Sequence, residues 1–366
     1  MPVDGFDHSP AGPASDLAGF RLVTLCGSAG GMHDAMRDSQ DLLEPVFRSR
    51  GIDVRPVDLG DWSAAAVPKL VAEIERQRPD GILMQYPTGA FGRSLGPVFL
   101  SLLHHVAPTM VMLHEFAAAH VIRKAAVGAL LLRVDRIGIT AERERRHLTA
   151  VYPWLRSRIR DVPIASNIPG RKWAPVTPPS VTYFGQLRPN KGIEEFVEVR
   201  KRVAAEMPEA AFTVVGAVVP QHADYAEALK RDAAAANIEI AQNLSIEQVA
   251  DVLARSTVAL MPFPDGASFR RGSMFAAAAC GTPIVTTTGA DTPPELSAYI
   301  EPARTIDELS ALTLTLLRDP AARDAAHRRS VDMSDKFGWE QTADSYCKVF
   351  RELREIGSSR ARPRGA

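Results

Sequence analysis

Two neighbouring arginines, Arg270 and Arg271, stand immediately before the stretch "GSMFAAAAC". The small residues of that stretch predict a helix that begins between Ser268 and Gly272 and ends at Gly281. The first N–H groups of a helix have no partner within it and lie at the positive end of its dipole, so they attract anions. Two arginines at this point therefore indicate an anion site. The alternative is that they are solvated charges on a loop.

A second loop with two cations follows an apolar run at residues 181–185. It contains Arg188 and Lys191, and Gly192 precedes a new helical stretch. Arginine and lysine bind phosphate oxygens through charge-assisted hydrogen bonds, so this loop is a candidate phosphate site. Exposed cations are common in loops, which keeps a purely structural role open.

Two further motifs were weighed for chemistry. The stretch "LCGSAGG" contains Gly30 and Gly31 after an apolar run, but its spacing is not G-x-G-x-x-G, so it does not indicate an NAD-dependent oxidoreductase. In "VMLHEFAAAH" the residues His114 and His120 are six positions apart and would not share a helix face, which argues against a zinc protease. His114 instead follows a buried strand at its carboxyl end.

The elements that must position these residues alternate between short apolar runs and longer amphipathic runs, as in parallel α/β proteins. The expected strands lie at residues 20–25, 54–59, 81–85, 110–113, 136–140, 181–185, 211–215, 238–240, 258–261 and 283–287. The proline-rich stretch around residues 171–180 predicts a linker. We therefore expect two Rossmann-like, doubly wound domains at residues 20–170 and 181–338 that face each other across a cleft, with disordered tails at residues 1–19 and 357–366.

Composition excludes several classes. The chain has 366 residues with 43 basic and 43 acidic side chains, so a general nucleic-acid binder is not expected. Its three cysteines lie far apart and suggest neither a disulfide framework nor a zinc ribbon. No secretory signal and no uninterrupted apolar run of about 20 residues was found. We expect a cytoplasmic protein without a membrane span, for which peripheral membrane contact is left open, as is the oligomeric state.

Several stretches together resemble the retaining glycosyltransferases of family 4 (glycosyl transferases group 1), which have the GT-B architecture. "FGQLRPNKGIEEFVEV" is similar to the family's phosphate loop, "ACGTPIVTTTG" to its signature after the donor helix, and "VMLHEF" to its strand ending in a histidine that faces the sugar. The resemblance implies metal-independent transfer of a sugar from a nucleotide diphosphate donor of UDP or GDP type to a small-molecule or glycan acceptor, with no cofactor. It also implies that helices near residues 339–356 cross back onto the first domain.

The resemblance assigns the site residues. The catalytic set is His114, Arg188 and Lys191. The donor-binding set is Gly30, Gly31, Gly185, Ile240, Asp265, Ser268, Arg270, Arg271, Gly272 and Ser273. No metal site is expected, because no Asp-x-Asp pair occurs in the chain.

The sequence also departs from the family's pattern. Two glutamates seven residues apart are usual across the donor helix, and Ser268 and Ala276 stand at those places. We expect Asp265 to take over the sugar-facing role, and the usual arginine after "FG" is Gln186. The alternative function is a GT-B scaffold that has lost transfer chemistry and acts as a ligand-binding or partner-dependent subunit.

Overall fold

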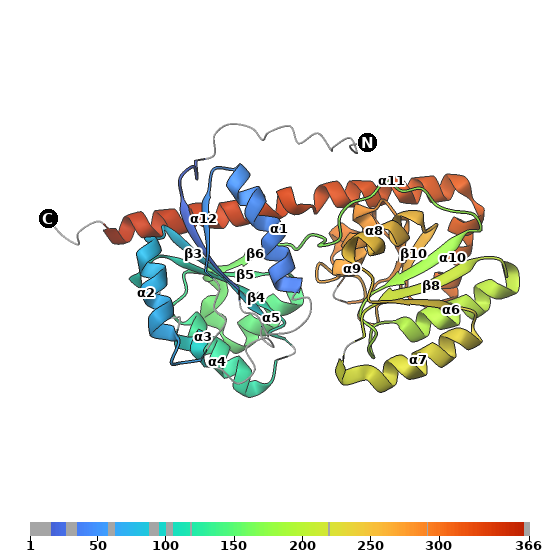
Figure 1. Cartoon of the computed structure of the whole chain (residues 1–366), viewed down its shortest axis with the longest axis horizontal. Helices are drawn as coiled ribbons and strands as arrows, with labels where there is room; N and C mark the ends of the chain where they lie inside the picture. The colour runs from blue at the N-terminus through green and yellow to red at the C-terminus, as the bar shows by residue number, and fades with distance from the viewer. Residues whose placement is uncertain are drawn as a thin grey trace. The chain divides into compact units, whose positions relative to one another are not determined.

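The computed structural model describes residues 16–26, 35–57, 63–87, 95–99, 105–117, 119–218, 220–290 and 292–361. These residues form two compact units (Figure 1). The first unit takes the chain up to Pro163 and again from Trp339, and the second is Ile164–Gly338. We expected the first domain at residues 20–170 together with the helices near residues 339–356, and the second domain at residues 181–338.

The first unit contains a parallel sheet in the order β2-β1-β3-β4-β5-β6. Its described strands are β1 (Arg21–Cys26), β2 (Asp53–Val57), β3 (Gly81–Pro87), β4 (Thr109–His114), β5 (Arg136–Ile139) and β6 (Ile159–Asp161). Its described helices are α1 (Ala35–Ser49), α2 (Val67–Gln77), α3 (Gly96–Phe99), α4 (Val121–Leu131), α5 (Glu142–Val151), the 3-10 helix η2 (Pro153–Arg158) and α12 (Trp339–Ala361).

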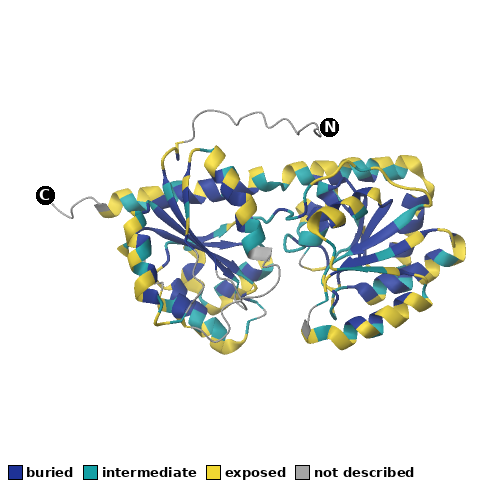
Figure 2. Cartoon of the chain, in the orientation of Figure 1, coloured by how far each residue is buried: buried dark blue, intermediate teal, exposed yellow. Residues whose placement is uncertain are grey.

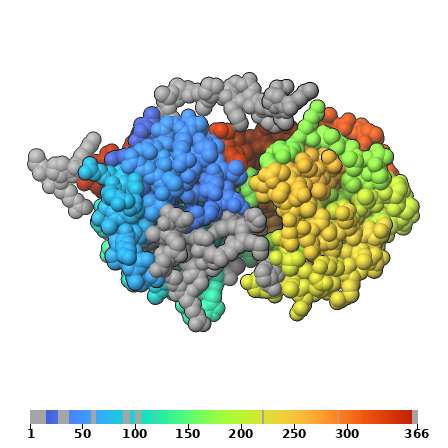
Figure 3. Space-filling model, in the orientation of Figure 1, coloured from blue at the N-terminus to red at the C-terminus, as the bar shows by residue number. Residues whose placement is uncertain are grey.

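The second unit contains another parallel sheet, in the order β12-β11-β10-β7-β8-β9. Its strands are β7 (Ser180–Phe184), β8 (Ala211–Gly216), β9 (Glu239–Gln242), β10 (Val258–Met261), β11 (Ile284–Thr287) and β12 (Glu301–Ala303). Its helices are α6 (Ile193–Glu206), α7 (Ala223–Ala235), α8 (Ile246–Arg255), α9 (Gly272–Ala279), α10 (Ile306–Arg318) and α11 (Pro320–Lys336), with 3-10 turns η3 (Pro220–His222) and η4 (Pro294–Ala298). Helices α7 (yellow) and α8 (orange) form much of its face in Figure 3.

The strands of both sheets are buried and the helices expose their outer faces (Figure 2). Local sequence explains several helix ends. Ser245 and Gln248 form a capping box at the start of α8, and the Asp319 side chain accepts hydrogen bonds from the first turn of α11. Gly281 has φ +65° just after α9, a conformation that favours glycine and ends the helix as expected.

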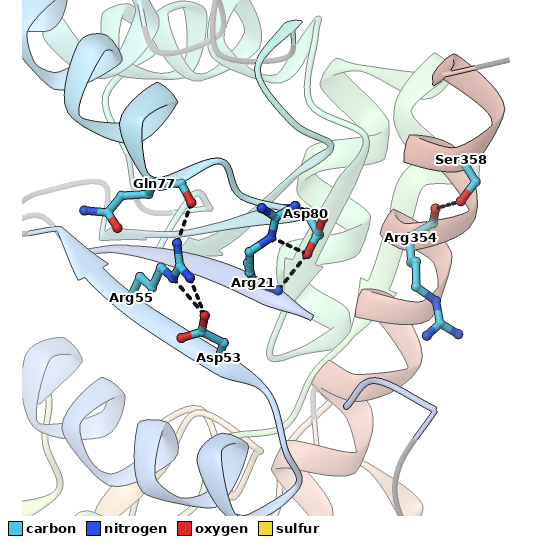
Figure 4. A network of polar contacts seen from close by, with 7 residues as sticks. All are labelled: Arg21, Asp53, Arg55, Gln77, Asp80, Arg354 and Ser358. Carbon is cyan, nitrogen blue, oxygen red and sulfur yellow. Dashed lines mark hydrogen bonds and ion pairs between the residues drawn. The ribbon is translucent and has the colours of Figure 1, made fainter. Parts of the chain in front are cut away.

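Ion pairs and hydrogen bonds lie at the edge of the first sheet where its strands begin (Figure 4). The candidate site residues of this sheet lie at the opposite edge, where the strands end. Arg21 binds Asp80 with an N–O distance of 2.7 Å. Arg55 donates to Asp53 at 2.9 Å and to the carbonyl oxygen of Gln77 at 2.6 Å. The Arg21 contact joins β1 to the segment before β3, and the contact of Arg55 with Gln77 joins β2 to the end of α2.

Our expectations for the two tails were wrong in part. Residues 357–361 are the last turn of α12 rather than part of a tail. Residues 16–19 form a turn that packs on the first unit, because Leu17 is fully buried and Asp16 binds Arg351 at 2.8 Å. Residues 1–15 and 362–366 lie outside the described residues.

The expected linker is not a free connection either. The Trp173 indole donates to the carbonyl oxygen of Ser256 at 2.8 Å, and the N–H groups of Ala174 and Val176 donate to the carbonyls of Ala254 and Arg255 at 2.9 and 3.0 Å. The segment therefore lies against the end of α8 within the second unit.

Helix α12 is part of the core of the first unit although it comes last in the chain. Tyr346 and Phe350 pack against Phe47, with ring centroids 5.6 and 5.3 Å away, and Phe350 also contacts Phe20. Burial of these aromatic rings is what holds the helix on this sheet.

Candidate functional site

The strand order of the second unit defines where a ligand would bind. After β7 the chain turns to β8 and β9 on one side, whereas β10, β11 and β12 lie on the other side of β7. In an open α/β sheet, ligands bind outside the carboxyl ends of the strands where the order reverses. That point lies between β7 and β10, so the loops after these two strands are the candidate site.

These two loops are in contact. A Cβ atom at Gly192, where φ is +85°, would lie 1.9 Å from the carbonyl oxygen of Pro262. A Cβ atom at Gly216 would likewise lie 2.0 Å from the carbonyl oxygen of Gly185. Only glycine permits these approaches, which bring the loops after β7, β8 and β10 together at one edge.

The loop after β7 holds Arg188 and Lys191 close to the sheet. The Nε atom of Arg188 donates to Gln186 Oε1 at 3.0 Å, and the Tyr183 hydroxyl donates to the carbonyl oxygen of Lys191 at 3.0 Å. Gln186, where the family has an arginine, therefore orients the arginine two positions later.

The loop after β10 contains an ion cluster. Asp265 binds Arg270 at 3.0 Å through one carboxylate oxygen and contacts Arg271 through the other. The Arg271 guanidinium also lies 4.3 Å from the centroid of the Phe263 ring, a cation–π contact. We expected Asp265 to face a sugar, but in this structure both of its oxygens face the arginines.

The pKa of Tyr183 is affected by charges from both loops. Burial raises the pKa of its hydroxyl, while the charges of Arg271 and Arg188 lower it. One buried hydroxyl at the end of β7 thus lies within electrostatic range of an arginine from each loop. Over residues 185–192 and 262–272, four cationic side chains accompany a single carboxylate. Each loop thus places cations at this edge of the sheet, where the charges of Glu194 and Glu195 at the start of α6 also act on Tyr183.

Helix α9 begins at this cluster. A Cβ atom at Gly272, its first residue, would meet no atom within 4 Å, and Ser273 is partly exposed. The start of α9 is therefore open beside Arg270 and Arg271, although the N–H of Gly272 donates to the carbonyl oxygen of Arg270 at 3.2 Å and that of Met274 to the carbonyl oxygen of Arg271 at 2.9 Å. The hydroxyl of Ser268 and the Nε of Arg270 are buried and have no hydrogen-bond partner in the described part of the chain.

The first unit supplies a neutral polar chain instead. Gln85 at the end of β3 donates through Nε2 to the Tyr346 hydroxyl at 3.3 Å, and its Oε1 lies 3.1 Å from His114 Nε2. Because Gln85 presents its oxygen, His114 Nε2 carries the proton and Nδ1 keeps the lone pair. Burial lowers the pKa of His114 to about 4, so its imidazole is neutral at pH 7.

The chain is similar in sequence to known proteins. Residues 178–319 match the family model of glycosyl transferases group 1. The resemblance to group 1 glycosyl transferases is thus confirmed. A GDP-mannose-dependent monoacylated alpha-(1-6)-phosphatidylinositol monomannoside mannosyltransferase of Corynebacterium glutamicum is 28% identical over 182 residues, which cover 45% of this chain and 45% of that relative. The chain therefore aligns with less than half of the length of this curated relative.

Solved structures match over almost the whole chain. HepE of Anabaena, in complex with UDP and glucose, has a TM-score of 0.67 at 13% identity and covers 91% of this chain and 100% of its own. Sucrose-phosphate synthase of Thermosynechococcus elongatus has a TM-score of 0.66 at 16% identity, with 92% and 100% covered. At these identities the likeness establishes the fold, which is GT-B.

The group 1 pattern can now be followed residue by residue. Ser268 is only 5% exposed, and Ala276 is fully buried in α9, where the family has glutamates. Ala276 packs within the core, and its methyl group offers no hydrogen bond to a ligand. Ile240 lies inside β9, paired with Val214, and packs against the core of the unit. Gly185 follows β7, whereas Gly30 and Gly31 lie outside the described residues.

Sequence reasoning missed several partners of the site. Gln186 and Phe263 are close in sequence to the cations that they contact, so these contacts could have been predicted from the sequence. Gln85 and Tyr346 are 261 residues apart, and no local pattern joins them. In the described part of the chain, no three His, Cys, Asp or Glu side chains gather as a metal site, and no helix is long and apolar enough to cross a membrane.

Proposed function

We propose that this protein transfers a sugar from a nucleotide diphosphate sugar to an acceptor, with retention at the anomeric carbon and without a metal ion. The observation that carries the proposal is the cluster of four cations on the loops after β7 and β10, at the point where the strand order reverses. A nucleoside diphosphate brings the negative charge that such a cluster requires.

The proposed chemistry follows from where charge develops. As the bond between sugar and diphosphate breaks, negative charge grows on the leaving phosphate oxygen. Arg188, Lys191 and the positive end of the α9 dipole near Gly272 would stabilise that charge, together with an arginine of the Arg270–Arg271 pair. The same phosphate oxygen would accept the proton of the acceptor hydroxyl, so no protein nucleophile is needed.

In this proposal Asp265 is a positioning residue. Its carboxylate contacts both arginines of the cluster and keeps two like charges next to each other in the absence of a ligand. Arg271, whose side chain is only 11% exposed, is further fixed by the Phe263 ring. Pre-ordered donors of this kind favour the charged transition state because they need no rearrangement when charge develops.

His114 would serve the transferred sugar as a neutral group. Its Nε2–H is held by Gln85, which leaves the Nδ1 lone pair to accept a hydrogen bond from a sugar hydroxyl. A histidine with a pKa of about 4 stays in this form over the physiological pH range.

The donor base is proposed as uracil or guanine. The mannosyltransferase relative is named for GDP-mannose, and the HepE structure contains UDP and glucose. A thermal-shift series with UDP, GDP and ADP tests the nucleotide: a ligand at about 100 times its dissociation constant stabilises the protein by about 2.7 kcal/mol. We expect UDP or GDP to raise Tm and ADP not to.

Activity and stereochemistry need separate measurements. With the preferred nucleotide, NMR of the product should show the anomeric configuration of the donor, and added EDTA should leave the rate unchanged. Binding of a nucleotide without transfer to any of a panel of acceptors and without donor hydrolysis would favour the non-catalytic scaffold, which the absence of carboxylates at Ser268 and Ala276 motivates. No binding of any nucleotide would contradict both functions.

A further inference from the structure

Helix α4 is apolar on two faces. Val127, Leu130 and Leu131 are buried against the first sheet. At 100° per residue a second face gathers Val121, Ile122, Ala125, Ala129 and Leu132, the last being the residue that caps the helix. On this second face the exposed fractions are 70% for Val121, 74% for Ile122 and 57% for Leu132. A surface helix would normally present polar residues there.

Neighbouring segments extend the apolar area. Trp154 of η2 is 59% exposed, and its ring lies 5.4 Å from that of Tyr152. The Tyr152 hydroxyl donates to the carbonyl oxygen of Lys124 at 2.9 Å, which holds both aromatic residues along α4. Helix α3 packs beside α4 (Figure 1); Leu95, just before α3, and Phe99 within it are 54% and 44% exposed. We call the exposed face of α4 together with Trp154 the α4 surface.

The segment that contains the α4 surface is rich in cations, although Arg136 and Arg160 bind Glu352 and Arg145 binds Asp161. Residues 121–160 contain ten arginines and lysines but three aspartates and glutamates, in a chain that is balanced as a whole. Those acids are engaged: Asp135 binds Arg360 at 2.5 Å, Glu142 binds Arg145 at 3.4 Å, and Glu144 accepts the N–H of Ala117 at 2.8 Å.

Two exposed arginines stand at the edge of the apolar area. Arg133 follows Leu132 directly, and Arg156 lies two residues after Trp154. Arg158, in the same turn, donates to the carbonyl oxygen of Leu132 at 2.9 Å, so the end of α4 and η2 are neighbours. Exposed apolar side chains, a tryptophan and a rim of arginines therefore occupy one region of the first unit.

We propose that the α4 surface binds a membrane that contains anionic lipids. Val121, Ile122 and Leu132 would enter the boundary between headgroups and acyl chains, Trp154 would lie at headgroup level, and Arg133 and Arg156 would meet lipid phosphates. A second copy of the chain is a poorer occupant, because a two-fold contact would bring the same arginines of both copies together. The proposal concerns binding by the first unit and does not depend on the proposed transferase activity.

The test is flotation of the full chain with vesicles of phosphatidylcholine, with and without phosphatidylglycerol, at low and high salt. We expect binding to the anionic vesicles, weakened by salt, and little binding to phosphatidylcholine alone. V121S/I122S and W154A should each weaken binding by about tenfold, and R133Q/R156Q by about tenfold or more. The matched control I246S/R231Q, on exposed positions of the second unit, should bind like the parent protein.

Each other outcome overturns the proposal. Equal binding to both vesicle types, no binding to either, or an equal loss in the control variant would show that this surface does not recognise an anionic membrane. A dimer in light scattering that V121S/I122S converts to a monomer would instead identify the α4 surface as a contact between copies. Unchanged Tm values of the variants show that these results do not come from unfolding.

Discussion

The two units share a six-stranded parallel sheet but differ in the chemistry at its carboxyl edge. In the described part of the first unit His114 and Gln85, from the ends of two strands, form a neutral chain with Tyr346 of α12. In the second unit they deliver cations, with Asp265 between two arginines. The same architecture therefore supports a neutral edge in one unit and a cationic edge in the other, because the residues at and after the strand ends set the charge. The predictions below test that difference.

The largest effect is expected at the cationic edge. R188A and K191A should each weaken binding of the preferred nucleoside diphosphate by roughly ten- to a hundredfold, since a hydrogen bond to a charged group contributes about 1.5 to 3 kcal/mol. The double variant should nearly abolish donor use. Calorimetry measures this, with R231A on α7 as the control; unchanged affinity in both single variants would refute the site assignment.

A smaller loss is expected at the neutral edge, and it should fall on turnover rather than on binding. H114A removes the group proposed to meet the sugar, so kcat should fall by about a hundredfold while the affinity for the bare nucleoside diphosphate stays the same. The exposed H147A variant is the control. A variant that mainly lowers Tm and keeps the specific activity of the folded fraction would assign His114 a structural role only.

The two arginines of the cluster should differ from each other. The Arg271 side chain is 11% exposed and contacts Phe263, whereas Arg270 is 28% exposed. R271Q should therefore weaken the nucleoside diphosphate by about tenfold, and R270Q by less, because the more buried cation acts through less solvent. The two titrations are compared directly, and a reversed order would mean that Arg270 makes the main ligand contact.

The neutral edge should also be the acid-sensitive one. The pKa of His114 is about 4 in the folded chain, whereas an exposed histidine, as in the unfolded chain, has a pKa of 6.5. The unfolded chain therefore binds the proton more readily than the folded chain. The contribution of His114 to the free energy of unfolding is complete above pH 6.5. It decreases by up to about 3 kcal/mol as the pH falls toward 4. Urea unfolding at several pH values should show a weaker acid dependence in H114Q than in the parent; an identical slope would contradict the assignment.

The smallest effect is expected away from both edges. Arg200 on α6 is 4% exposed and lies 5.1 Å from the centroid of the Phe212 ring, and among the described residues its Nε and Nη1 have no hydrogen-bond partner. Burial lowers its pKa, which means that the charge is disfavoured there. R200M should raise the free energy of unfolding by about 1 kcal/mol, with R231M as the control. A loss of stability would show that the cation–π contact outweighs desolvation.

The sequence by itself determined the strands and loops that a short stretch of neighbouring residues encodes. Strand β10 lies at Val258–Met261 as expected, and the other strands of the core were placed within one or two residues, because apolar runs between turn residues encode buried strands. The cations of both loops were also readable, since each follows a strand and precedes a helix. Strands β6 and β12 were missed, because three residues are too few to show a pattern.

Only the tertiary structure decided which groups meet. The pairing of Asp265 with both arginines depends on the path of one loop, and the burial of Ala276 depends on which face of α9 meets the core. The contact between Gln85 and Tyr346 spans 261 residues. The exposed face of α4 is apolar in sequence like its buried face, so composition cannot tell them apart. Each of these facts follows from packing between distant segments, which no local spacing encodes.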